Sequence, residues 1–368
     1  MNVKRIRLLL QVFMLLAIWA CTEPFDPVID VHDRVLVVEG VVTDQEGPQR
    51  VRLSYGVPFG ETLFNQQVTG AIVYVEDQAG SKTYFPEAEP GVYLSSNHFR
   101  AREGGSYTLH VETVEGDVYR SDPQWLNPQP YVEKIDVLVD RRMMEFQNIR
   151  GEQEFGEVEG LAFSTLMETT GQQVPMMRFQ STILVQYVLY ELDPEIPGDP
   201  NYNYCIRKVG VDDNVNLTVA EIDVSVGDAI THEVGFMPTV LRFYEGDPTN
   251  TWGFLRTERR VWILQQYALN EESYAYYKGL RELLSSEGRM FDPIPGQLHG
   301  NIRCVNDPSK LALGFFEVSA MQATTFAITP RPYLDGLVRI YKTHDMHQLP
   351  EQECYYEQLP PYWLHRDN

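Results

Sequence analysis

The sequence predicts a mainly β protein: an N-terminal Ig-like or regulatory-like β-sandwich, followed by a second, larger β-rich domain with one main helix. Two observations carry this prediction. Between residues 35 and 123, about seven short segments alternate apolar and polar residues, with turn signals roughly every 8–12 positions. Aromatic residues, which strands favour, make up 12% of the chain.

The first domain is expected over residues 34–128. Its strand-like segments read VLVVEGVVTD, QRVRLSYG, TGAIVYVEDQAGSKTYFPE, GVYLSS and GGSYTLHVETVEGDVYRSDP. In the second of these, Val51, Leu53 and Tyr55 alternate with polar residues, which is typical of a half-buried strand. Prolines at 123, 128 and 130 mark the end of the domain.

The second domain is expected over residues 131–348, with a proline- and aromatic-rich tail at 349–368. Charged residues and two glycines predict a loop at 141–157, and prolines predict another at 193–201. The remaining segments predict strands at 131–140, 158–167, 177–192, 203–210, 229–236, 239–245, 253–268, 310–319, 322–329 and 336–343.

One segment has helical periodicity, at about 271–286. Asn270 can cap it, and the acidic residues that follow suit the positive end of a helix. Tyr277, Leu280 and Leu284 recur at helical spacing, so we expect this face to pack on the second domain.

The amino terminus predicts a secretory leader and a lipid anchor. Lys4, Arg5 and Arg7 precede an apolar run at 8–20, which is shorter than the ~20 residues that span a bilayer. Ala20-Cys21 resembles the lipidation site of bacterial lipoproteins, so Cys21 is the expected lipidated first residue, followed by an acidic tether to residue 33. An ordinary signal peptide with an incidental cysteine, or a retained anchor, are the alternatives.

The charge of the chain limits its partners. Without residues 1–20, which contain three basic and no acidic residues, the net charge falls from −22 to −25. Nucleic acid is therefore not an expected partner, because binding it requires a basic surface. The membrane is expected to be contacted through the acyl anchor alone.

Three cysteines remain after lipidation: Cys205, Cys304 and Cys354. An oxidising compartment predicts one disulfide and one spare thiol, and three pairings are possible. We favour Cys205 with Cys354, because this bridge would hold the aromatic tail. The spacing of the cysteines does not match a zinc or thiol-redox motif.

An ordered set of segments resembles the DUF4249 family of Bacteroidota outer-membrane lipoproteins. The first half contributes VLVVEGVVTD, TGAIVYVED-x-x-G, GVYLSS and G-x-SYTLHVET-x-x-G-x-VYRSDP, and the second half LNEESYAYYKGL, MFDPIPGQLHGNI and LALGFFEVSA. The resemblance covers about 30–330 and is weakest at about 141–260. It implies a place at the cell surface beside a TonB-dependent outer-membrane barrel, and it provides no catalytic residues.

The sequence contains no strong motif for catalysis, cofactor binding or metal binding. Nucleophile-elbow, P-loop, HExxH and dinucleotide-binding patterns are not found, and no cofactor or metal is predicted. The residues around His344 and His347, and the Asp212-Asp213-Asn214 turn, are better explained as solvated loops. Trp262 is expected in the core.

Three aromatic residues are the candidates for contact with a ligand: Trp252, Tyr202 and Tyr204. The expected function is a non-enzymatic, surface-exposed outer-membrane lipoprotein that assists or captures ligand for a TonB-dependent transporter. A structural subunit of an outer-membrane complex, without a small-molecule ligand, is the alternative, and a surface hydrolase is a third reading.

Overall fold

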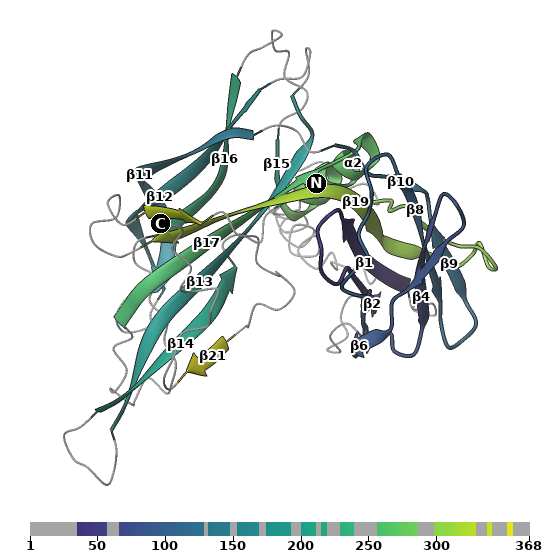
Figure 1. Ribbon diagram of the computed structural model, residues 1–368, viewed down its shortest axis with the longest axis horizontal. Coiled ribbons are helices and arrows are strands. Elements are labelled where there is room, and N and C mark those ends of the chain that lie inside the picture. The colour runs from purple at the N-terminus through teal and green to yellow at the C-terminus, as the bar shows by residue number, and fades with distance from the viewer. Residues whose placement is uncertain are drawn as a thin grey trace, which may run out of the picture.

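The mainly β architecture is confirmed. The computed structural model describes residues 35–56, 66–128, 132–147, 153–168, 174–192, 200–210, 215–218, 229–238, 256–285, 298–328, 337–340 and 352–355. Figure 1 shows two β lobes, with one long strand, β19 (Ala312–Ile328), running through both.

The first lobe is a sandwich of two sheets. One sheet contains β1 (Val35–Thr43), β2 (Arg50–Gly56), β3 (Gln66–Gln67), β6 (Glu87–Glu89) and β7 (Val92–Leu94). The facing sheet contains β4 (Ile72–Asp77), β5 (Lys82–Tyr84), β8 (Ser106–Glu112), β9 (Val118–Ser121), β10 (Gln124–Trp125) and β18 (Ile302–Cys304).

Alternation of side chains builds the core between these sheets. On β2, Val51 and Leu53 are fully buried while Arg50 and Arg52 are exposed. Val75 and Leu109 meet them from the facing sheet in one apolar cluster. The predicted β-sandwich is therefore confirmed.

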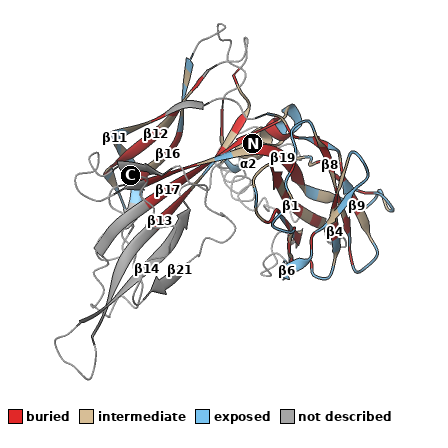
Figure 2. Cartoon of the chain, viewed as in Figure 1, coloured by how far each residue is buried: buried red, intermediate tan, exposed pale blue. Residues whose placement is uncertain are grey.

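The second lobe contains longer strands. They are β11 (Val132–Gln147), β12 (Gln153–Glu168), β13 (Met177–Leu192), β14 (Pro200–Gly210), β15 (Asn216–Leu217), β16 (Ala229–Pro238), β17 (Arg256–Ala268), β20 (Leu337–Ile340) and β21 (Gln352–Tyr355). Strands β11, β12 and β16 form their own sheet. Its Phe163 stacks on Trp262 of the facing sheet at 3.7 Å, and Trp262 is fully buried as predicted. Figure 2 shows buried segments in both lobes.

Strand β19 joins the lobes into one sheet, in the order β21-β14-β13-β17-β19-β1-β2-β7-β6. Its first half pairs in parallel with β1, and its second half pairs antiparallel with β17. The sequence predicted two strands here, at 310–319 and 322–329, but the structure has one. Ile302, Cys304 and Phe316 belong to the core of the first lobe, so residues 34–128 do not build that core alone.

The predicted loop at 141–157 is wrong over most of its length. Strand β11 continues to Gln147 and β12 begins at Gln153. Charges that suggested a loop are paired across strands instead: Arg141 with Glu159 at 3.1 Å, and Arg142 with Glu233 at 2.7 Å. The predicted strand at 239–245 lies outside the described residues.

The helix α2 (Glu271–Ser285) is confirmed, and the side chain of Asn270 accepts the N–H of Ser273 at 2.8 Å as its cap. Its predicted packing face is wrong at the far end. Ser273 and Tyr274 are buried, whereas Leu284 is 54% exposed. The helix contacts β15 and β19: the Tyr274 hydroxyl donates to the carbonyl of Thr218 at 2.7 Å, and Arg281 donates to the carbonyl of Leu217 at 3.4 Å.

Candidate functional site

A buried ion pair lies where β19 passes from one lobe to the other. Arg178 of β13 donates to both carboxylate oxygens of Glu317 on β19, at 2.9 and 3.2 Å, and Glu317 is fully buried. The Tyr277 hydroxyl of α2 and the Ser319 hydroxyl each donate to Glu317 at 2.6 Å. Strands from the second lobe and the helix thus converge on one carboxylate.

Aromatic rings enclose the cation of this pair. The Arg178 guanidinium lies 4.0 Å from the ring centre of Tyr267 and 4.7 Å from that of Tyr277. Burial opposes the charge of Arg178, but Glu317 and the tyrosines outweigh it and raise the pKa of Arg178. Burial also raises the pKa of Tyr277 well above its ordinary value, so the phenol stays a donor. Both oxygens of Glu317 accept hydrogen bonds from protein donors, which indicates that this ion pair has a structural role.

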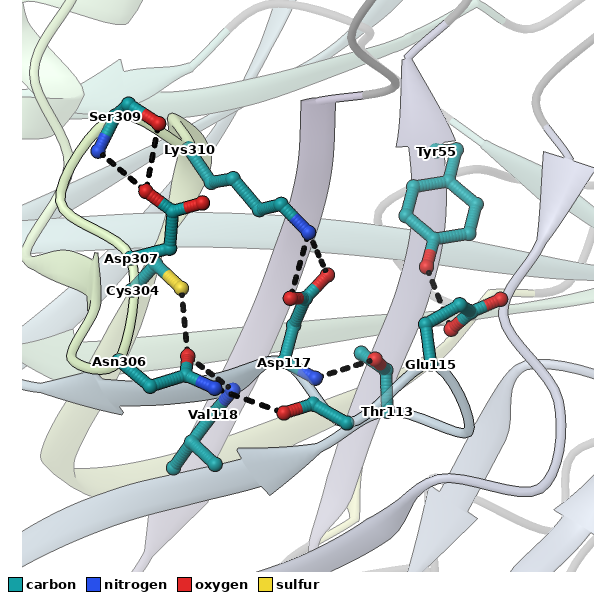
Figure 3. A network of polar contacts seen from close by, with 11 residues as sticks. Tyr55, Thr113, Glu115, Asp117, Val118, Cys304, Asn306, Asp307, Ser309 and Lys310 are labelled. Carbon is teal, nitrogen blue, oxygen red and sulfur yellow. Dashed lines mark hydrogen bonds and ion pairs between the residues drawn. The ribbon is translucent and has the colours of Figure 1, made fainter.

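A second polar network fastens the segment before β19 to the tip of the first lobe (Figure 3). Lys310 donates to both carboxylate oxygens of Asp117 at 2.6 and 2.7 Å. The side-chain oxygen of Asn306 accepts the N–H of Val118 at 3.0 Å and the thiol of Cys304 at 3.2 Å. The two strand-connecting loops are therefore held together by side-chain contacts.

Two glycines allow backbone segments to approach each other closely where β19 pairs with β1. A Cβ on Gly300 would lie 1.7 Å from the carbonyl oxygen of Gly314, and a Cβ on Gly314 would lie 1.9 Å from that of Val38. The buried side chain of Asn301 accepts the N–H of Phe316 and donates to its carbonyl, both at 2.9 Å. Asn301 thus pairs with β19 as a strand backbone would.

The outer face of the first lobe carries a row of aromatic and basic side chains. Five residues are register partners across β5, β4, β8, β9 and β18, in the order Tyr84, Tyr74, His110, Arg120 and Arg303. Their neighbours along each strand point into the core, so this row faces outward. The rings of Tyr74 and His110 stack at 4.6 Å.

A shallow polar groove of about 310 Å³ lies beside this row. Its lining includes Glu76, Asp77, Ser106, Thr108, His110 and Arg120. Arg120 is exposed and forms no ion pair or hydrogen bond with the described residues, whereas Arg303 pairs with Asp122. The groove therefore offers carboxylates, hydroxyls and one unpaired guanidinium, and it is our candidate binding site.

His110 is expected to stay neutral at physiological pH. Burial lowers its pKa, Glu76 at 3.6 Å raises it in part, and Arg120 and Lys82 lower it further. The unfolded chain, with an ordinary pKa near 6.5, takes up a proton first as the pH falls. The stability associated with neutral His110 is therefore present above about pH 6.5 and is lost as the pH falls toward the folded pKa.

An NMR titration of the His110 ring can test this prediction. Glu76→Gln should lower the pKa of His110 further, and Arg120→Gln should raise it, because the two variants remove charges of opposite sign. A His110 pKa above 6.5 in the folded protein would contradict the prediction.

The structure does not test most of the site residues predicted from the sequence. Cys21 and Trp252 lie outside the described residues, as do the His344 and Asp212 segments. Tyr202 and Tyr204 lie on β14, where only the backbone is described. Sequence reasoning missed His110 and Arg120, although both occupy the polar positions of alternating strands.

The described residues also bear on metals and membrane spans. Within these residues, no group of three or more His, Cys, Asp or Glu side chains is arranged to bind a metal ion. The described helix is also not one that could cross a bilayer.

Comparison with protein families gives one match. The model of DUF4249, a domain of unknown function, matches residues 22–325. The chain belongs to the DUF4249 family. No match was found among the curated proteins or the solved structures.

The segments in which the sequence resembles DUF4249 have structural roles in this chain. LHGNI contains Gly300 and Asn301, and LALGFF contains Gly314 and Phe316, which are the residues of the close contact described above. These DUF4249 segments therefore fasten β19 to the first lobe.

Proposed function

We propose that this DUF4249 protein is a non-enzymatic lipoprotein, anchored in the outer membrane through Cys21 and exposed at the cell surface. In this proposal it captures a ligand for a TonB-dependent transporter, or assists that transporter as an accessory subunit. The support comes from the leader-like residues 1–20, the Ala20-Cys21 site and what the family resemblance implies.

The groove on the first lobe is the observation that carries the capture role. Unpaired Arg120 can bind a carboxylate or phosphate, and Glu76 and Asp77 can bind an ammonium group. A small polar ligand with groups of both signs fits this lining. Most of these side chains come from β4, β8 and β9, which are paired with one another.

The partner can be tested by purifying the full chain from native membranes in mild detergent and identifying any co-purifying barrel. We expect a TonB-dependent transporter in the wild-type sample. The same chain with Cys21→Ser should lack acyl chains and lose the membrane fraction, which provides the control for anchoring. Recovery of the wild-type chain without any barrel would count against the accessory role.

Capture can be tested separately by native mass spectrometry of the purified chain. A bound small molecule is expected in the wild type and should be lost in Arg120→Gln. Arg141→Gln is the matched control, because Arg141 is an exposed arginine on the other lobe. Equal occupancy in both variants would place the ligand elsewhere.

The location can be tested by protease treatment of intact cells. The surface proposal predicts cleavage before lysis. Full protection until lysis would place the protein on the periplasmic side and remove the capture role.

The structural-subunit alternative is favoured by a different surface. Strand β11 is at an edge of its three-stranded sheet, and large apolar side chains on one face of β11 and β12 are exposed, among them Val139, Met143 and Phe155. Such side chains are typical of a protein interface. If Met143→Lys abolishes co-purification of the barrel while Arg120→Gln does not, the interface role is favoured.

A further inference from the structure

The pairing of β14 with β21 places two cysteines opposite each other. In this antiparallel pair, Cys205 is the register partner of Cys354. Directly opposed residues in antiparallel strands have Cα atoms about 4.5–5.5 Å apart, which lies within the range of about 4.4–6.8 Å that a disulfide spans. We propose that Cys205 and Cys354 form an intramolecular disulfide that clamps β21 onto β14.

The third cysteine is held in another part of the fold. Cys304 lies on β18 in the first lobe, is buried in that lobe's core and is a free thiol. Its thiol donates to Asn306 at 3.2 Å. Of the three possible pairings, the backbone brings together only Cys205 with Cys354, and Cys304 remains the spare thiol.

The bond forms by ordinary thiol–disulfide exchange, with an oxidised dithiol oxidoreductase of the export compartment as the oxidant. The thiolate of one cysteine attacks the disulfide of the oxidant and forms a mixed disulfide, and the second thiolate then displaces the oxidant's sulfur. Two protons leave the chain, and two electrons reduce the oxidant to its dithiol. In the cell, formation of this disulfide rests on the export of the chain that is part of the proposed function.

The clamp would stabilise a weak edge of the long sheet. Strand β21 is four residues long and pairs only with β14 in the described sheet, at the end of the strand order. A strand this short is held by few backbone hydrogen bonds, and its loss would uncover β14, which has eleven residues. An uncovered edge can pair with another chain. Reduction is therefore expected to promote self-association.

The bond can be tested by peptide mapping of the full chain, alkylated during denaturation without reductant. We expect a peptide that links Cys205 to Cys354, and an alkylated Cys304. Cys304→Ser should keep the linked peptide, whereas Cys205→Ser should lose it and leave Cys354 alkylated. A bridge that includes Cys304, or alkylation of all three cysteines, would overturn the proposal for the exported protein.

A second measurement tests the Cys205–Cys354 pairing independently of whether the chain is exported. The reduced chain is refolded in an oxidised and reduced glutathione mixture and mapped in the same way. A Cys205–Cys354 bridge in the refolded sample, but free thiols in the cellular sample, would support the geometry and count against export. Free thiols after refolding would reject the pairing itself.

Discussion

Replacing Glu317 with alanine is expected to lower the free energy of unfolding by about 3–5 kcal/mol, because it leaves the buried guanidinium of Arg178 without its counter-charge. The Tyr277 and Ser319 hydroxyls lose their acceptor in the same variant. Urea unfolding, followed by the fluorescence of tryptophans that include buried Trp262, provides the measurement. We expect a lower midpoint for the unfolding of both lobes, because β19 belongs to both.

Two variants act as controls for this result. Glu233→Ala removes a partly exposed partner of Arg142 and should change the free energy of unfolding by about 0–1 kcal/mol. The double variant Arg178→Met/Glu317→Leu removes both buried charges, as well as the Arg178 Nε, which lacks a hydrogen-bond partner in the described structure. It should recover much of the loss. A loss below about 1 kcal/mol in Glu317→Ala would show that water reaches Arg178.

Replacing Gly314 with alanine is expected to lower the free energy of unfolding by about 2–6 kcal/mol, which combines backbone strain of about 1–3 kcal/mol with overpacking of about 1–3 kcal/mol. Gly314 has φ of +91°, a region that side chains disfavour. Its added Cβ would also meet the carbonyl of Val38, which lies on β1 and pairs with this part of β19. Thermal unfolding can report the loss.

Gly80 provides the matched control for strain alone. Its φ of +79° is similar, but a Cβ there would meet no atom within 4 Å. Gly80→Ala should therefore lower the free energy of unfolding by about 1–2 kcal/mol. Equal losses in the two variants would show that the chain relaxes around position 314 and that the close approach to β1 is unimportant.

Alternation of side chains made much of the fold predictable. Arg50 and Arg52 of β2 alternate with Val51 and Leu53, and this local pattern is enough to place a half-buried strand. The helix was equally readable, because Asn270 and the acidic first turn are local signals. The packing face of the helix could not be predicted in the same way, because the extent of its contact depends on where β15 and β19 lie.

Contacts between distant residues explain what the sequence did not reveal. Glu233 pairs with Arg142 from 91 positions away, so the charges at 141–157 suggested a loop. Glu317 is buried by Arg178 from 139 positions away, and neither residue stands out in its own segment. The groove was missed for the same reason, because Glu76 and Asp77 come to lie near His110 only through the pairing of β4 with β8.

The parallel pairing of β1 with β19 has a mechanical consequence. The expected lipid tether enters β1 at its start, while the second lobe holds β19 at its far end, and the two strands are paired over eight successive positions. A pull between membrane and partner would draw these strands in opposite directions along their length. Such shear loads all the hydrogen bonds between them at once instead of opening them one by one. If the chain is anchored at Cys21 as proposed, the pairing of β1 with β19 would thus resist tension between the anchor and the second lobe.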